Sequence, residues 1–324
     1  MKKNRMIMSL LLFLVLVSSL FPIEKNKKKF TLELYTGFST LNPSDLNLRA
    51  ENEEQRERFF RDDYYSYLET MGKINSLEKQ MQEGFETIKN AFPLGFRLKY
   101  YLNNSMAISL GFLYLSRNQT SDVLQEFYFN YDSRQYKVTQ EYSPYTLTVQ
   151  GYAPMIGIHL GKKISRTLEI EGCVSGGPIF ASCGYTFEQQ ERWYFADSTP
   201  LHRTPAWFVE ENGSGTGINL DSSVRLNIDM GNNIGIFLES GYAYRRVNQL
   251  SGSGLEKIGT DYSSWEGEWG IKESHLVTEW GSFDSQYPSN YWGENALPKM
   301  REFKLNLSGF QVRVGISFTF FKTN

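Results

Sequence analysis

Near the end of the chain, residues 310–321 read FQVRVGISFTFF, and an apolar residue occupies every second position of this segment. A period of two predicts a β-strand with one apolar face and one polar face. In a soluble β-protein the apolar face fills the core, whereas in a barrel surrounded by lipid it points outward. Other parts of the chain must decide between these two arrangements.

Seven further strand-like segments precede this one, so the expected number of strands is even. They cover residues 29–41, 92–102, 106 to a turn near 132, that turn to 161, 167–185, 219–230 and 234–246. Each reaches the roughly 9 to 11 residues that a tilted strand needs to cross a membrane. The sequence therefore predicts an all-β fold: one domain over residues 29–321 that forms an eight-stranded antiparallel up-and-down transmembrane β-barrel. The apolar alternation changes phase near Pro154, which suggests a β-bulge there.

The connections between these strands alternate between short and long. Tight turns are expected around Asn104, Ser165 and Asn232, and long loops over about 42–91, 190–217 and 247–303. In bacterial outer-membrane barrels the turns on the periplasmic side are short, the extracellular loops are long and both termini are periplasmic. The same arrangement is expected here, in the outer membrane.

The first residues of the chain have the pattern of an export signal. Basic residues at positions 2, 3 and 5 precede the apolar run MIMSLLLFLVLVSSLF, and Val17 and Ser19 suit the −3 and −1 positions of a cleavage site. We therefore expect a signal peptide over residues 1–19. A retained anchor is the alternative.

The polar face of the strands combines glycine with long charged side chains. Glycine weakens a strand unless its small size is needed, and the lumen of an eight-stranded barrel, which side chains just fill, supplies that need. Buried charges require partners of opposite sign, so we expect a packed ion-pair network instead of an open pore. Arg245 shares the same face. The predicted network contains Glu33, Arg97, Lys99, His159, Glu169, Glu171, Arg225, Glu239 and Arg313.

The apolar face of the strands is then expected to contact lipid. Tyr100, Tyr242, Tyr244 and Phe320 are candidates for the aromatic girdles at the two membrane interfaces. A secreted soluble β-protein, with this face as its core, is the alternative.

The charge balance and the cysteine spacing bear on two further features, a nucleic-acid-binding surface and a disulfide. The chain has 34 Lys and Arg against 36 Asp and Glu, and this balance argues against a nucleic-acid-binding surface. On one unbroken strand Cys173 and Cys183 would lie roughly 33 Å apart, too far for a disulfide. They can pair only if the segment 176–178 folds the chain back, which is left open.

Two of the expected loops have distinctive compositions. The first loop is helix-rich by propensity, and Leu77, Met81, Phe85 and Ile88 fall on one face of its later helix. It would form a cap that binds a partner, a plug in the barrel mouth, or a helical hairpin packed on its own barrel. The last loop is rich in aromatic residues, which stack on glycans, anchor protein partners, fill loop cores or touch lipid headgroups. The candidate binding surface comprises Trp265, Trp269, Trp280, Tyr291 and Trp292.

Together, the signal peptide, the eight strands, the filled polar lumen and the terminal GISFTFF resemble the small outer-membrane β-barrel proteins of Gram-negative bacteria, the OmpA/OmpX/OmpW-like group. The resemblance covers nearly all of the mature chain except the long loops. It implies a monomer in contact with outer-membrane lipid and lipopolysaccharide, whose terminal aromatic residue is recognised by the barrel-assembly machinery. Here Phe321 is followed by three more residues, which departs from that pattern.

We expect a structural or surface-interaction protein that acts through its extracellular loops on a protein or glycan ligand. One alternative is a narrow conduit for small apolar molecules, suggested by the inward positions of Leu113, Leu115 and Phe237. A second is an enzyme acting on lipid or peptide at the barrel rim with His202 or His275. Neither histidine has a recognisable catalytic constellation, and the sequence shows no metal-ligand spacing or cofactor motif, so no catalytic residue and no cofactor is expected.

Overall fold

The computed structural model describes residues 30–48, 50–51, 70, 77–81, 84–131, 134–195, 199–203, 206–248, 250–258, 261–268, 270–272 and 300–320. The expected signal peptide over residues 1–19 lies outside this part of the chain, as does Phe321.

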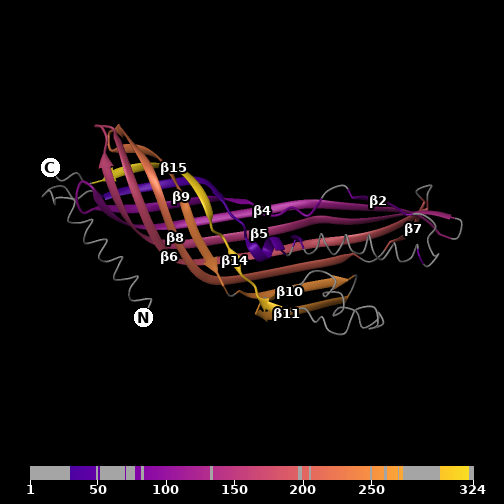
Figure 1. Ribbon diagram of the computed structural model, residues 1–324. Coiled ribbons are helices and arrows are strands. Elements are labelled where there is room, and N and C mark those ends of the chain that lie inside the picture. The colour runs from indigo at the N-terminus through magenta and orange to yellow at the C-terminus, as the bar shows by residue number, and fades with distance from the viewer. Residues whose placement is uncertain are drawn as a thin grey trace.

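Eight antiparallel strands form a closed ring (Figure 1). Each strand pairs with its neighbours in the ring, and the last pairs with the first, with Phe30 opposite Phe320. Closure leaves no unpaired strand edge in the barrel, as a lipid environment requires. The predicted eight-stranded barrel is therefore confirmed. In ring order the strands are β1 (Phe30–Thr40), β3 (Asn90–Tyr101), β4 (Met106–Tyr131), β5 (Arg134–Lys163), β6 (Leu168–Phe195), β8 (Trp207–Gly231), β9 (Ile234–Val247) and β15 (Gly309–Phe320).

Three tight turns lie at the same end of the barrel as the start of β1 and the end of β15. The β3–β4 turn is closed by Leu102, whose N–H donates to the carbonyl of Met106 at 2.9 Å. In the β8–β9 turn, Asn232 and Asn233 have φ of 51° and 62°. Positive φ at both central residues is the pattern of a type I′ hairpin turn, and asparagine is among the few residues that adopt it readily.

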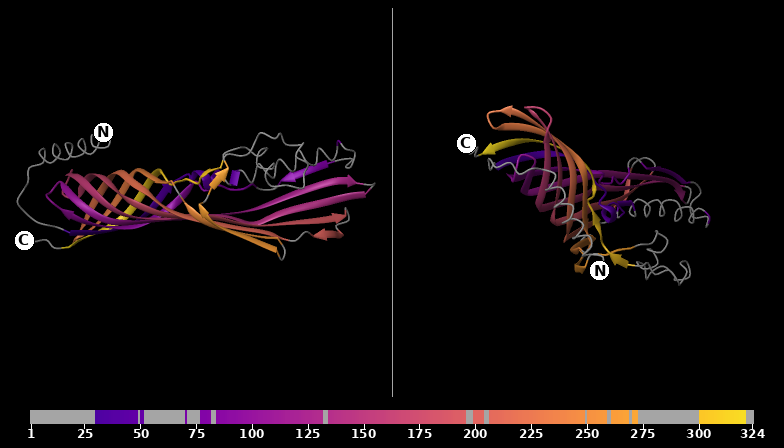
Figure 2. Two further views of the ribbon diagram at one scale, coloured as in Figure 1. Left: turned by 90° about the horizontal axis from the view of Figure 1, so that it is seen from below. Right: turned by 60° about the vertical axis from the view of Figure 1, so that its left-hand side comes forward.

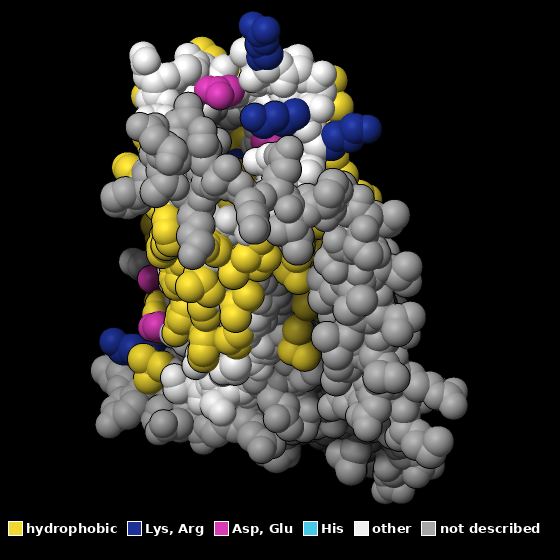
Figure 3. All heavy atoms as spheres, turned by 90° about the vertical axis from the view of Figure 1, so that its left-hand side faces the viewer, with side chains coloured by type: hydrophobic (Ala, Val, Ile, Leu, Met, Phe, Trp, Pro, Cys, Tyr) yellow, Lys and Arg dark blue, Asp and Glu magenta, His cyan; other side chains and the backbone are white. Residues whose placement is uncertain are grey.

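The alternation of buried and exposed residues shows whether the apolar face of the strands points inward or outward. On β15, Val312 and Val314 are 46% and 54% exposed, whereas Arg313 between them is 1% exposed. The same inversion holds around the ring, and Figure 3 shows apolar side chains over much of the described barrel surface. Exposed apolar side chains around a charged interior suit lipid and not water. The lipid-facing belt, as we call this surface, includes Leu34, Leu94, Leu98, Leu110, Ile156, Val174, Leu220, Val224, Leu238, Val312, Val314 and Ile316.

Aromatic side chains border the lipid-facing belt. At the turn end Tyr100 packs on Phe30, with ring centroids 5.0 Å apart. At the other end Tyr152 stacks on Phe180 at 5.1 Å, and Tyr242 packs against the ring of Phe310 at 5.4 Å. Rings at these two levels are typical of membrane-interface girdles.

Four strands continue far beyond the barrel as an open sheet (Figures 1 and 2). The pairing of β3 with β4 stops at Ser116, but β4 continues to Tyr131. These fifteen further residues span about 50 Å at about 3.3 Å per residue. We call this part the extended sheet. Besides the outer parts of β4, β5, β6 and β8, it contains β2 (Leu77–Met81), β7 (Pro200–Arg203), β10 (Ser251–Ile258) and β11 (Asp261–Glu268).

Part of the expected loop over 190–217 belongs to this sheet. β6 continues to Phe195 and β8 begins at Trp207. Above a membrane the outer face of a sheet meets water, so these strands do not need the apolar alternation that marks the lipid-spanning ones. Because this stretch is polar and lacks that alternation, the outer parts of β6 and β8 were not predicted from the sequence.

The first loop also differs from its prediction. Helix occurs over residues 44–48 and 50–51, but Leu77 and Met81 lie in β2, which pairs with β4. Residues four apart share one face of a helix and also one face of a strand, because four is an even number. The spacing of Leu77 and Met81 was therefore ambiguous, and pairing with the edge of β4 decides for the strand.

The predicted bulge at Pro154 is not found. On β5 every odd-numbered side chain from Tyr145 to Gly161 is buried, and the register shifts lie instead at Ser121–Val123 and Tyr142–Thr146. Met155 inside and Ile156 outside are both apolar, which made the phase appear to change.

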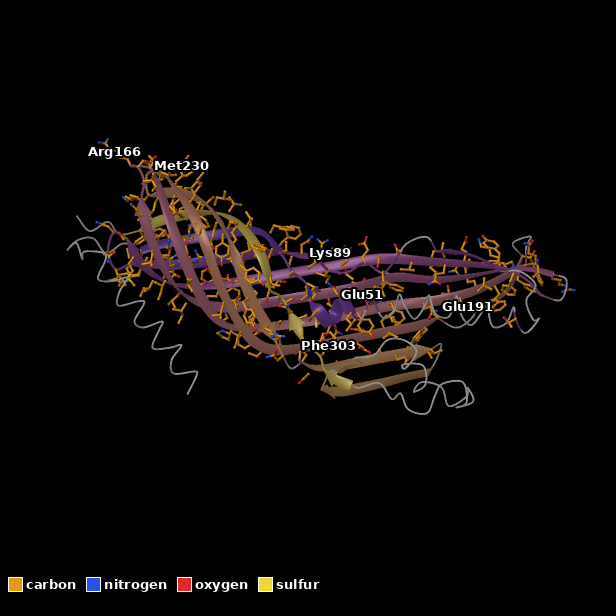
Figure 4. The ribbon with its side chains drawn as sticks, in the orientation of Figure 1. Glu51, Lys89, Arg166, Glu191, Met230 and Phe303 are labelled. Atoms are coloured by element: carbon orange, nitrogen blue, oxygen red, sulfur yellow. The ribbon has the colours of Figure 1, made fainter. Side chains whose placement is uncertain are left out.

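The barrel mouth beneath the sheet is closed by an apolar core. Leu41, Leu46 and Ile88 from the first long connection are buried in one cluster with Leu113 and Ile179 from the barrel. Phe303 and residues 305 and 307 join from the other side, next to β14 (Leu305–Asn306), which pairs with β9. In Figure 4, Glu51, Lys89 and Phe303 lie where the barrel ends and the sheet begins.

The remaining described elements are small. β12 (Gly270–Lys272) pairs with β13 (Met300–Glu302) in a sheet of their own. In the part of the chain described here, helices are too short or too polar to cross a bilayer. Cys173 and Cys183 lie on one continuous strand, β6, and both are buried free thiols.

Candidate functional site

Strand register brings the charged side chains of the lumen together. Glu171, Arg225, Glu239 and Arg313 are successive cross-strand neighbours on β6, β8, β9 and β15, and their charges alternate in sign. Glu33 on β1 is likewise the partner of Arg97 on β3. Opposite charges on directly paired positions stabilise a sheet. The alternation gives every charge in this row a neighbour of opposite sign.

Two glutamates form the centre of this network. The carboxylate of Glu33 lies 2.7 Å from Arg225, 3.3 Å from Lys99 and 3.4 Å from Arg97. Glu239 lies 3.0 Å from Arg313, 3.2 Å from Arg97 and 3.9 Å from Arg225. Shared partners tie five strands of the ring together.

A second group surrounds Glu171. Its oxygens accept hydrogen bonds from the Lys99 Nζ at 2.6 and 2.7 Å, and one of them lies 2.5 Å from the Nδ1 of His159. The Nε2 of His159 lies 2.8 Å from the Oγ of Ser109 and 3.7 Å from the Sγ of Cys173. His159 is thus part of the packed lumen.

Ser109, His159 and Glu171 have the connectivity of a serine nucleophile, its base and an orienting acid. The setting does not suit catalysis. Ser109 and His159 are 4% and 1% exposed, so a substrate has no route to the hydroxyl. Lys99 also holds both oxygens of Glu171. We assign these contacts to packing of the lumen.

The structure adds Asp221, which the sequence analysis missed. Its carboxylate lies 2.5 Å from Arg313 and 3.2 Å from Arg245. Asp221 lies on β8 four residues before Arg225, and hence on the same face. Following the alternation back from Arg225 would have found it.

Glu169 is the member of the predicted set that stands apart. It is half-buried near the tight turns, and among the described residues it forms no ion pair within 4.0 Å. It lines a polar cavity of about 320 Å³ at the turn end of the barrel, together with Thr31, Lys163, Asn227 and Thr319.

The cationic side chains of the ion network are packed and buried inside the lumen. Arg97, Lys99, Arg225 and Arg313 are each 0–1% exposed, and aromatic rings pack between them. The guanidinium of Arg225 lies 3.4 Å from the centre of the Phe237 ring. The lumen at this level is therefore occupied by packed and paired side chains.

Above the ion network lies an apolar layer with the predicted Leu113 and Leu115, whereas the predicted Phe237 lies lower, two residues nearer the tight turn than Glu239 and against Arg225. The three predicted side chains are 0–2% exposed and pack in one core with Leu46 and Ile88. A conduit for apolar molecules needs this layer to line an open channel. In the described part of the chain it is instead filled by the protein's own side chains.

The tryptophan-rich surface is only partly described. Trp265 lies in β11, where its backbone pairs with Gly254. Trp269, Trp280, Tyr291 and Trp292 lie outside the described residues, as does His275, and His202 lies in β7 opposite Trp193. The proposed surface therefore stays a prediction.

The outer face of the extended sheet carries uncharged polar side chains just above the aromatic girdle. One row runs across five strands through Ser116, Gln150, Ser182, Ser214 and Ser251, each opposite the next. The next row runs through Asn118, Thr148, Gly184, Asn212 and Ser253. Most of these residues line a shallow hollow of about 730 Å³.

No protein-family model matches the sequence, and no curated protein matches it either. Several solved structures are similar in fold.

A major outer membrane protein from Thermus thermophilus is 12% identical, over 91% of this chain and 100% of that one, with a TM-score of 0.39. OprG from Pseudomonas aeruginosa is 7% identical over 92% and 99% of the two chains, with a TM-score of 0.34. Ail from Yersinia pestis, solved with the heparin analogue sucrose octasulfate, is 7% identical over 91% and 99%, with a TM-score of 0.30.

Proposed function

We propose that this chain is an outer-membrane β-barrel protein that works as a sealed anchor and presents its extended sheet, on the extracellular side, to glycan or protein surfaces. The barrel supplies the anchor, because its outside is apolar and its inside is packed with paired charges. Both ends of the described barrel chain lie with the tight turns. In the usual orientation of such barrels this end is periplasmic and the sheet is extracellular.

The observation that carries the proposal is the contrast between a filled lumen and a sheet that extends about 50 Å beyond the barrel. A transport protein needs a path through its barrel, and the described lumen is closed by side chains at two levels. A sheet of this length instead reaches well past the lipid headgroups. Its surface is the part of the molecule available to other cells, to matrix or to soluble partners.

The side chains on this sheet favour a saccharide as one class of contact. Serine hydroxyls and the amides of Gln150 and Asn212 both donate and accept hydrogen bonds, as sugar hydroxyls do. Their rows lie directly above the aromatic girdle, at the level of lipid headgroups. Contact with the saccharide of lipopolysaccharide there, a monomeric state and recognition by the barrel-assembly machinery are part of the same proposal.

The test removes the outer hairpin without touching the barrel. Residues 124–141 are replaced by Asn-Gly, so that β4 and β5 still pair at Val123 and Tyr142 and Tyr145 stays in the core at the barrel mouth. Cells that display either protein are passed over surfaces coated with neutral polysaccharide, acidic polysaccharide or matrix protein. We expect retention of the wild type on at least one coating and about tenfold lower retention of the shortened protein.

Planar-bilayer conductance of both proteins serves as the control, and both should be electrically silent. Equal retention of the two proteins would place the interaction below the hairpin, for example on the polar rows with Gln150 and Asn212, which the shortened protein keeps. Steady conductance of the wild type would overturn the sealed anchor and favour a conduit.

A further inference from the structure

At the upper end of the ion network, the positive charges outnumber the carboxylates, and some buried hydrogen-bond donors have no partner among the described residues. We call the group of side chains at this end the Arg245 cluster. It contains Asn219 and Asp221 from β8, Arg245 from β9, and Gln311 and Arg313 from β15. All five side chains belong to residues that are at most 2% exposed. Polar groups at such depth need partners inside the protein or a bound species.

The first observation is a surplus of positive charge. Arg245 and Arg313 share the single carboxylate of Asp221, at 3.2 and 2.5 Å. Their Nη2 atoms also share the Oε1 of Gln311, at 2.8 and 2.7 Å. Glu239 also contacts Arg313, at 3.0 Å, but it is bound by Arg97 as well.

The surplus extends to the whole network of described ion pairs. Five cations face four carboxylates in it, which leaves one positive charge, and a protonated His159 would only enlarge the difference. The cations are Arg97, Lys99, Arg225, Arg245 and Arg313, and the carboxylates are Glu33, Glu171, Asp221 and Glu239.

The second observation concerns hydrogen bonds, and it is independent of the charge count. Four buried nitrogens of the cluster have no partner among the described residues: Asn219 Nδ2, Arg245 Nη1, Gln311 Nε2 and Arg313 Nε. Every side-chain oxygen of the cluster already accepts at least one hydrogen bond. The unmet hydrogen-bonding need of the cluster therefore lies with its donors.

These two observations favour an anion over water. A water molecule would have to donate its own two hydrogens as well as accept, and it would leave the surplus positive charge uncancelled. An anion accepts from several N–H groups and cancels the surplus charge at the same time. Because the surrounding side chains are almost fully buried, a compact ion is favoured over a polyatomic oxyanion.

We propose that the Arg245 cluster binds one small monovalent anion of the halide class, chloride in a physiological medium. The ion accepts hydrogen bonds from the unpartnered nitrogens of Arg245, Arg313, Asn219 and Gln311. It balances the lumen charge and thereby completes the seal between the ion network and the apolar layer.

The test compares thermal unfolding of the refolded protein in sodium chloride, sodium bromide and sodium gluconate at equal ionic strength. A ligand that binds only the folded state raises the unfolding midpoint until its site saturates. We expect a saturable rise of about 2–4 °C with chloride and bromide relative to gluconate. Arg245→Met should lose this rise. Arg166→Met, at an exposed turn residue, is the matched control and should keep it.

A crystallographic measurement covers the case in which Arg245→Met does not fold. Crystals of the wild type grown in bromide should show one anomalous peak within hydrogen-bond distance of Arg245 Nη1 or Arg313 Nε. The proposal is overturned by equal midpoints in chloride and gluconate, by a halide effect that persists in Arg245→Met, or by crystals that lack bromide at the cluster.

Discussion

At the scale of single residues, three of the four buried carboxylates of the ion network, Glu33, Asp221 and Glu239, are each held by more than one cation. Glu33 contacts Arg97, Lys99 and Arg225, whereas Glu169 lies at the turn end of the barrel without an ion pair in the described structure. Removing one partner from a buried ion pair is costly because the other charges stay behind without water. Replacing each of these two glutamates by glutamine therefore distinguishes the loss of a carboxylate inside the ion network from the loss of one outside it.

We expect Glu33→Gln to lower the free energy of unfolding by about 3–5 kcal/mol. Glu169→Gln should change it by less than about 1 kcal/mol, because this side chain is half-buried and free of ion pairs among the described residues. Urea unfolding in detergent micelles, followed by tryptophan fluorescence, measures both. Equal losses at the two positions would contradict the network as the source of lumen stability.

At the scale of elements, the β8–β9 turn depends on the backbone at Asn232, where φ is 51°. A β-branched residue is strained in this left-handed region, whereas glycine is not. Asn232→Val should therefore destabilise the protein by about 1–2 kcal/mol, and Asn232→Gly should be neutral within about 0.5 kcal/mol. The two variants control for each other, since both remove the same amide. Similar unfolding midpoints for both would show that the turn bears no strain.

The strands inside the membrane were predictable because lipid enforces alternation. Val312, Arg313 and Val314 could only be read as exposed, buried and exposed once the barrel was recognised. Outside the lipid this constraint ends, so the outer parts of β6 and β8 and the whole of β2 were not foreseen. In these segments strand pairing is decided by contacts with distant parts of the chain.

Prediction of the lumen site shows the same limit. The face of Glu33, Arg97 and Arg225 followed from parity, but which carboxylate meets which cation depends on strand register and tilt. Neither can be read from one strand at a time. The surplus positive charge of the Arg245 cluster became visible only when the partners were known.

At the scale of the whole molecule, two positions on the outer face of β8 distinguish a membrane barrel from a soluble one. Val224 and Ser214 both lie on the outer face of this strand and both are exposed. Val224 belongs to the lipid-facing belt, with 62% of its surface exposed, whereas Ser214 lies above the aromatic girdle in the row of polar residues. In water an arginine is tolerated at either place, because neither side chain is packed.

In a bilayer the two positions differ. Arginine at the middle of the lipid-facing surface of a barrel costs roughly 2–4 kcal/mol, and the cost falls toward zero outside the hydrocarbon. Val224→Arg should therefore destabilise the protein in phospholipid vesicles by that amount, and Ser214→Arg should leave it unchanged. Denaturant unfolding in vesicles gives both values. If the two variants are equally stable, the belt around the barrel does not lie in lipid, and the apolar outer face would need another partner to cover it.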